Sequence, residues 1–311
     1  MSHPHVRPDV RKFLDFLNAL PGPRSHQVGP AEARQMMHAS RHVADAPVGE
    51  LAVIRDIAGG PVPMRLYDAR DSREAGPLIL FFHGGGFVLG DLDTHEPFCA
   101  EMARAMDLPV LAVDYRLAPE HPWPAGPEDA IAAARWATAS PRELGRAFTG
   151  LVTCGDSAGG NIAIVVGLAL RDEPAAVPVL AQFPIYPAAN PAQGYPSFED
   201  FGEGYLLTRD SMRFFDQCYA ADAKDWRFSP MVKSQSGMPP TLVVTAGLDP
   251  IRDQGRAYAA ACIEAGVPTM FREAQGNIHG FINLRKAIPS SDKDIRACFA
   301  LLKLMLNEVT A

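Results

Sequence analysis

The sequence lacks the features of a membrane-spanning, secreted or nucleic-acid-binding protein. None of its apolar runs reaches the roughly 20 residues of a membrane span, and the polar start at residues 1–9 has no signal-peptide core. The net charge of −7 comes without any basic run, which argues against a nucleic-acid partner. Five cysteines occur without a C-x-x-C pair, which is typical of reduced thiols rather than of disulfides or a zinc site. We therefore expect a cytoplasmic protein with no metal, no membrane span and no nucleic-acid partner.

Apolar stretches alternate with helical ones along most of the chain, and the 47% share of hydrophobic residues is enough for a sizeable core. Apolar runs without polar alternation are typical of central parallel strands that are covered on both faces. These runs are 77–83, 110–114, 150–154, 178–183, 241–246 and 268–273. Helical segments lie between them, at about 94–106, 127–140, 158–171, 250–265 and 291–308. A hairpin is predicted where 51–57 and 63–68 flank Gly59 and Gly60. The alternation predicts a doubly wound, mostly parallel α/β sheet with an antiparallel start.

Two parts of the chain depart from this alternation. Residues 1 to about 45 are helix-like and weakly amphipathic, with a break at residues 21–23. More than fifty residues separate the strand that ends near Ile185 from the strand that begins at Thr241, and they include a helix-like segment at 208–219. An insertion of this size in an α/β fold is often a lid or a binding element.

The middle of the sequence carries the pattern G-x-S-x-G, as Gly155-Asp156-Ser157-Ala158-Gly159. The pattern lies between a predicted strand and an apolar, proline-free helix, and a sharp turn there would strain Ser157 and expose its hydroxyl. The small residues on either side leave room for such a turn. The same pattern also occurs in ordinary glycine-rich connections, so alone it does not decide between a nucleophile and a loop.

Three consecutive glycines follow the third predicted strand, in His-Gly-Gly-Gly-Phe at residues 83–87. Such a run lets the backbone approach a ligand closely and turns N–H groups towards it. Together with G-x-S-x-G downstream, it matches the oxyanion-hole loop of lipases and esterases. We interpret His83 as a structural anchor of this loop, because in such enzymes the catalytic base follows the acid in the chain.

The order serine, acid, histidine restricts the rest of a catalytic triad. Of the nine histidines only His279 follows the G-x-S-x-G serine, so His279 is the candidate base. The acid must lie just beyond a strand end, and Asp249 follows the predicted strand 241–246. Its rivals are Asp253, about one helical turn further on, and Glu273.

Several segments together resemble the bacterial hormone-sensitive-lipase-like esterases, within the α/β-hydrolases. They are HGGGF at 83–87, DYRLAPE at 114–120, GDSAG at 155–159, GEGYLLT at 202–208, GLDPIRD at 247–253 and IHGF at 278–281. They span the chain from about residue 50 to the C-terminal helix. Two departures do not touch the chemistry: Gln254 stands where relatives often have an acidic residue, and Pro-Trp-Pro at 122–124 replaces a simpler Phe-Pro.

The resemblance implies an α/β-hydrolase fold as a single domain over residues 1–311. This fold has an eight-stranded, mostly parallel sheet with helices on both faces and a helical cap, here from about 1–45 and 188–225. The resemblance also favours Asp249 over its rivals, which gives a triad of Ser157, Asp249 and His279.

The resemblance assigns the surrounding residues as well. The oxyanion donors are expected to be the N–H groups of Gly84, Gly85 and Ala158. Asp156 is interpreted as scaffold, and Asp114 as a structural partner of Arg116 or of its loop. Five aromatic residues are expected around the substrate, although each fits a core position equally well: Phe87, Tyr186, Phe214, Phe215 and Phe281.

These assignments predict a serine carboxylic ester hydrolase for short- to medium-chain acyl esters, with an acyl-enzyme intermediate and no metal or organic cofactor. Two alternatives stay open, a non-catalytic small-molecule receptor on the same fold and an amidase or peptidase with the same triad. The presence of all three triad residues disfavours the receptor. On resemblance alone, a homodimer formed through an edge strand is open too.

Overall fold

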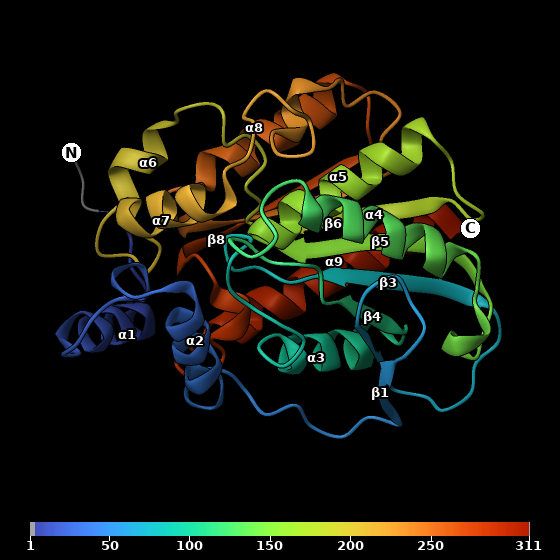
Figure 1. Ribbon diagram of the computed structural model, residues 1–311, viewed down its shortest axis with the longest axis horizontal. Coiled ribbons are helices and arrows are strands. Elements are labelled where there is room, and N and C mark those ends of the chain that lie inside the picture. The colour runs from blue at the N-terminus through green and yellow to red at the C-terminus, as the bar shows by residue number, and fades with distance from the viewer. Residues whose placement is uncertain (1–3, 311) are drawn as a thin grey trace.

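A central β-sheet organises the protein in the computed structural model, which describes residues 4–310 (Figure 1). In this range the sheet has eight strands in the order β1-β2-β4-β3-β5-β6-β7-β8. Strand β2 is antiparallel to β1 and β4, and the pairs from β4 to β8 are parallel. The strands are β1 (Val53–Ile57), β2 (Met64–Asp68), β3 (Gly76–Phe82), β4 (Val110–Val113), β5 (Phe148–Asp156), β6 (Val179–Ile185), β7 (Thr241–Leu248) and β8 (Thr269–Ile278). The predicted hairpin and mostly parallel sheet are confirmed.

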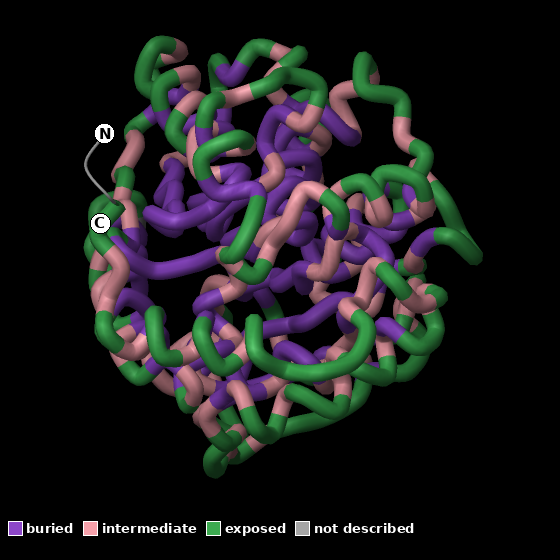
Figure 2. The backbone as a smooth tube through the Cα atoms, turned by 90° about the vertical axis from the view of Figure 1, so that its left-hand side faces the viewer, coloured by how far each residue is buried: buried purple, intermediate pink, exposed green. Residues whose placement is uncertain are grey.

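Helices cover both faces of the sheet because the central strands are apolar on both faces. In β3, Ile79 and Phe81 pack into one buried cluster, and Leu80 and Phe82 pack into another, as the two-residue period of a strand requires. The first cluster includes residues of α3 (Glu96–Met106) and α9 (Ser291–Thr310), and the second includes residues of α4 (Ala125–Thr138) and α5 (Ala158–Asp172). Helix α8 (Arg252–Glu264) packs beside α5. Figure 2 shows the buried residues gathered at the centre, with exposed turns around them.

The two segments that depart from the alternation lie on the same side of the molecule (Figure 1). The N-terminal segment forms α1 (Pro8–Ala19), η1 (Ser25–Gln27) and α2 (Pro30–Ala44). The insertion forms α6 (Pro196–Phe201), which the sequence did not predict, and α7 (Arg209–Tyr219). The hydroxyl of Thr208 accepts from the Ser211 N–H and so caps the start of α7. Three short helical turns complete the chain: η2 (Arg142–Leu144), η3 (Pro230–Val232) and η4 (Phe281–Asn283).

A buried ion pair ties the end of α2 to the body of the protein. Arg285 Nε lies 2.7 Å from Asp45 Oδ1, and its Nη2 lies 3.0 Å from Oδ2, with both side chains buried. The carbonyl of Ala44 accepts from the N–H groups of Lys286 and Ala287 beside this pair. Since a buried charge is costly without its partner, the pair fixes where α2 lies relative to the sheet.

Candidate active site

Ser157 occupies the sharp turn that joins β5 to α5. Its backbone φ is +56°, a value that a residue with a Cβ adopts only where its surroundings enforce it. A Cβ on Gly155 or on Gly159 would collide with the carbonyl of Phe82, so the turn requires glycine at both positions. Helix α5 begins at Ala158, which leaves its first N–H groups without helical partners next to the Ser157 hydroxyl.

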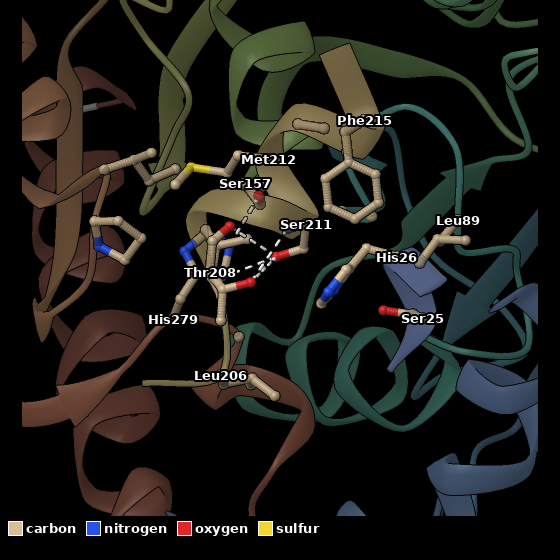
Figure 3. A pocket seen from close by; sticks show the side chains of 18 of the residues that line it. Ser25, His26, Leu89, Ser157, Leu206, Thr208, Ser211, Met212, Phe215 and His279 are labelled. Carbon is tan, nitrogen blue, oxygen red and sulfur yellow. Dashed lines mark hydrogen bonds between the residues drawn. The ribbon is translucent and has the colours of Figure 1, made fainter. Parts of the chain in front are cut away.

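The three predicted triad residues meet at the ends of β5, β7 and β8. His279 Nε2 lies 2.9 Å from Ser157 Oγ (Figure 3). His279 Nδ1 lies 2.7 Å from Asp249 Oδ2. Asp249 is fully buried, and its Oδ1 accepts the N–H of Ile251 at 2.9 Å. This geometry lets the imidazole accept the serine proton at Nε2 while the carboxylate holds Nδ1–H.

Both rival carboxylates are occupied elsewhere. Asp253 accepts from the Ser197 N–H and pairs with Arg252 and Arg256. Glu273 pairs with Arg256 as well. Neither carboxylate is bonded to His279, which agrees with the choice of Asp249.

The glycine loop corrects one predicted oxyanion donor. The N–H of Gly84 donates to Asp156 Oδ1 at 2.8 Å, so it is directed into the scaffold and away from the oxyanion. Among the described residues, the N–H groups of Gly85, Gly86 and Ala158 have no hydrogen-bond acceptor. Gly85 and Ala158 therefore remain candidate donors, and Gly86 replaces Gly84.

A buried network beneath the loop holds this arrangement. Asp156 Oδ1 lies 3.2 Å from His95 Nε2, and Asp156 Oδ2 accepts from the Tyr186 hydroxyl at 3.3 Å. Burial opposes the ionisation of Asp156, but His95 and the Gly84 N–H keep the pKa of this carboxyl below its ordinary value. Asp156 is thus scaffold, as predicted. The sequence did not single out His95, because it lies in no recognised motif.

His83 anchors the glycine loop from inside the core. Its Nδ1 lies 2.9 Å from the carbonyl of Gly84, and its ring stacks on Tyr115 at 4.4 Å. Burial and the neighbouring His95 lower the pKa of His83 to about 4, which keeps the ring neutral near pH 7. His83 makes no bond to Ser157, in agreement with its predicted structural role.

A cavity of about 890 Å³ opens over the triad. The N-terminal segment contributes residues such as Leu17, His26 and Met37 to its walls, and the insertion contributes Leu206 and Met212. Several of these side chains face the space in front of Ser157 (Figure 3). Because the walls are mainly apolar, the cavity suits an organic substrate with few polar groups.

The predicted substrate-contacting aromatic residues divide into two groups. Phe87 and Phe215 line the cavity. Phe281 and Tyr186 do not, because both are buried and their rings pack edge to face at 5.3 Å. Phe214 lies beside Phe215 and packs against the core, and it is not among the residues that line the cavity. It is therefore wrong to assign three of these residues to the substrate pocket: Tyr186, Phe214 and Phe281.

The prediction that Asp114 pairs with Arg116 is also wrong. Arg116 donates instead to Asp129 on α4, through Nε at 2.8 Å and Nη2 at 2.8 Å. The Asp114 carboxylate has no hydrogen bond or ion pair among the described residues. Burial and the nearby carboxylates of Asp91 and Asp93 raise the pKa of Asp114 to about 6.

Replacing Asp114 by asparagine is therefore expected to stabilise the protein at pH 8 and to leave it nearly unchanged at pH 4. The pKa of Asp114 is higher in the folded state than in the unfolded chain, so the wild type loses stability as the pH rises through about 6. Asparagine avoids this loss, which we put at about 1 kcal/mol for a carboxylate with partial solvent access. Thermal unfolding of both proteins at the two pH values measures the effect. An equal difference in Tm at pH 4 and pH 8 would contradict it.

The described residues contain no group of three or more histidines, cysteines or acids placed to hold a metal ion. Among the helices of residues 4–310, none combines the length and the apolar character needed to cross a membrane.

Comparison with known proteins agrees with this fold and with these motifs. A family model described as alpha/beta hydrolase fold matches residues 79–283. Esterase LipI of Mycobacterium tuberculosis is 34% identical over 317 residues, which cover 98% of this chain and 96% of that protein. Carboxylic ester hydrolase LipN of the same organism is 43% identical over 260 residues, or 80% of this chain and 69% of that protein.

Solved structures show the same fold over nearly the whole chain. An α/β hydrolase from the metagenome of Lake Arreo, Spain, has a TM-score of 0.91 at 34% identity and covers 99% of both chains. A thermostable esterase from Pseudomonas putida has a TM-score of 0.91 at 27% identity and covers 98% of this chain and 99% of its own.

The fold defines the class of the protein as an α/β hydrolase. More narrowly, the chain belongs to the hormone-sensitive-lipase-like esterases of the α/β-hydrolase superfamily. Its enzyme class is that of the carboxylesterases.

Proposed function

We propose that the protein hydrolyses short- to medium-chain acyl esters through a covalent acyl-enzyme on Ser157. The observation that carries this proposal is the continuous hydrogen-bond chain from Ser157 Oγ through His279 to Asp249 at the floor of an apolar cavity. A non-catalytic receptor would not need this chain intact. The carboxylesterase class of the family agrees with the proposal.

In the first step Ser157 Oγ attacks the acyl carbonyl while His279 Nε2 takes the serine proton. Asp249 holds Nδ1–H and stabilises the imidazolium that forms. His279 then returns the proton to the leaving alcohol as the carbon–oxygen bond breaks, which leaves the acyl group on Ser157. Water, deprotonated by His279, attacks the acyl-enzyme and releases the acid.

The negative charge of each tetrahedral intermediate requires N–H donors that are already in place. We assign this role to Gly85, Gly86 and Ala158. Ala158 opens α5, so the positive end of the helix dipole faces the same position. Because Asp156 draws the Gly84 N–H into the scaffold, it fixes the direction of the two glycine N–H groups that follow.

The size of the cavity supports a small organic ester as the substrate. About 890 Å³ is within the range of small-molecule sites, and the N-terminal segment and α7 enclose it. We propose that these two segments form the cap of the site. The cytoplasmic location and the homodimer stay predictions from the sequence.

Kinetics on p-nitrophenyl esters of increasing acyl length, with a matched p-nitroanilide, tests the proposal. We expect kcat/KM to be highest at short to medium acyl lengths and to fall for long chains, with the anilide turned over far more slowly. Negligible turnover of every ester would overturn the enzyme assignment, and turnover of the anilide at the rate of the ester would assign an amidase instead.

A further inference from the structure

Helix α7 presents one continuous face to the cavity. Its cavity-lining residues are Ser211, Met212, Phe215, Asp216 and Tyr219. Residues three and four apart are neighbours on a helix, so Asp216 lies beside Met212 and Tyr219 at one edge of this face. Asp216 is the residue of this face that carries a formal negative charge.

Two contacts hold this face over the glycine loop. A Cβ on Gly86 would collide with the ring of Phe215, so this ring lies directly against the loop. The ring of Tyr219 stacks on Phe87 with centroids 4.1 Å apart and an interplanar angle of 2°. Both contacts are made to the loop that carries candidate oxyanion donors, and Asp216 lines the same cavity as Gly85 and Gly86.

The Asp216 carboxylate differs from the other charged groups of the cavity in having no partner. Asp45 pairs with Arg285, and Asp156 is bonded to the Gly84 N–H. Two basic groups in the same walls are also engaged, since Arg24 donates to the Leu17 carbonyl and Arg41 is bonded to His38. Among the described residues no ion pair or hydrogen bond reaches the Asp216 side chain.

The surroundings of this carboxylate are neither core nor open solvent. Its side chain is accessible, yet burial alone raises its pKa, with no nearby cation to oppose the shift. An accessible but desolvated group lies in a concave surface, here the cavity wall. A carboxylate in this position has no cationic partner in the cavity wall, and a positively charged group of a bound molecule can become its partner.

We propose that Asp216 and the neighbouring Phe215 ring form a subsite for an ammonium group carried by the ester substrate. The ring of Phe215 faces the cavity (Figure 3), and Asp216 lines the same cavity. The carboxylate supplies charge attraction, and a carboxylate with an aromatic ring is the combination that recognises quaternary ammonium ions. The proposal rests on the ester hydrolysis proposed above. It concerns which esters bind well, and it assigns Asp216 no part in bond breaking.

Two pairs of isosteric esters test the subsite, because each pair differs only by a quaternary nitrogen in place of a quaternary carbon. The alcohol-side pair is 2-(trimethylammonio)ethyl butyrate and 3,3-dimethylbutyl butyrate. The acid-side pair is phenyl 4-(trimethylammonio)butanoate and phenyl 5,5-dimethylhexanoate. The measured quantity is the ratio of kcat/KM for the charged ester to kcat/KM for its neutral isostere. Intrinsic reactivity cancels when this ratio is compared between wild type and variants.

For at least one pair, Asp216→Asn is expected to lower this ratio about tenfold, mainly through KM of the charged ester. The neutral isostere should keep its kcat/KM within about twofold, and Asp216→Glu should retain most of the preference. Asp210→Asn is the matched control. Asp210 lies on the same helix, pairs with Arg213 outside the cavity and carries the same charge, so its loss should leave the ratio unchanged.

An unchanged ratio in both pairs for Asp216→Asn would overturn the subsite, and so would an equal fall for the charged and the neutral ester. If Asp210→Asn lowers the ratio as much as Asp216→Asn does, the effect comes from the overall charge of the protein. That result would also overturn the subsite. Hydrolysis of the neutral esters by the wild type would leave the esterase proposal standing in each of these cases. If the wild type turns over none of the four esters, both proposals fail.

Discussion

Replacing Ser157 by alanine is expected to lower kcat on a short-chain ester by about 10⁴- to 10⁶-fold. The variant loses the only oxygen of residues 4–310 that lies at hydrogen-bond distance from His279 Nε2, 2.9 Å away, so no covalent acyl-enzyme forms. What remains is the contribution of the oxyanion donors and of binding, which the substitution does not touch. Within the described part of the chain the Ser157 hydroxyl has no hydrogen bond other than that to His279, so the protein should keep its Tm within a few degrees.

Reaction with a phosphonate ester, whose phosphorus an activated serine attacks with loss of the leaving group, gives a second readout of the same variant. Wild type should gain one phosphonyl group, mapped to Ser157 by peptide mass, because only an activated and accessible serine reacts in this way. The Ser157→Ala protein should gain none. Ser229→Ala is the control, since the Ser229 hydroxyl is fully buried and has no hydrogen-bond partner among the residues that the structure describes. Its loss should change neither kcat nor labelling. Labelling of the Ser157→Ala protein at another serine would show that the nucleophile is assigned wrongly.

The sheet and the meeting of Ser157, Asp249 and His279 could be predicted because they depend on patterns that are local in the sequence. The strands are runs of apolar residues that are buried on both faces, so the runs themselves mark them. The turn at Ser157 requires glycines at fixed offsets, because a Cβ there meets the carbonyl of Phe82. Chain order left His279 without a competitor.

The hydrogen-bond partners that could not be predicted depend on contacts between segments far apart in the chain. The Gly84 N–H was predicted as an oxyanion donor, but it is taken up by Asp156, which lies 72 residues away in the sequence. Arg116 was expected to bind a carboxylate two residues away, yet α4 brings Asp129 closer. In both cases a charged or polar group had the right chemistry, and the tertiary structure decided its partner.

Aromatic residues show the same limit for the substrate pocket. Phe215 and Phe281 have the same side chain, but Phe215 lines the cavity from α7 while Phe281 is fully buried against Tyr186. Hydrophobic burial stabilises both kinds of position, so residue type alone does not separate them. Asp216 was not predicted as a site residue for a related reason. In the sequence, an acidic residue on a polar helix cannot be distinguished from an ordinary solvent-exposed acidic residue.

Replacing Asp249 by asparagine is expected to lower kcat by about 10²- to 10⁴-fold with little change in KM, because the acid acts mainly in the transition state. The Ile251 N–H donates to Asp249 Oδ1, so this position must keep an oxygen in the variant. The asparagine NH₂ group then takes the place of Oδ2 and donates to His279 Nδ1, 2.7 Å away in the wild type. A ring that accepts at Nδ1 carries its proton on Nε2, and this tautomer cannot take the proton of Ser157.

Asp253→Asn is the matched comparison, because it makes the same substitution four residues further along the chain. Asp253 accepts from the Ser197 N–H and pairs with Arg252 and Arg256, so its role is to join α6 to α8. We expect kcat to stay within about threefold of wild type, with a lowered Tm from the lost ion pairs. The measurements are kcat and KM on one short-chain ester and thermal unfolding of all three proteins. If folded Asp249→Asn stays active while Asp253→Asn is the severe lesion, Asp249 is not the carboxylate that orients His279.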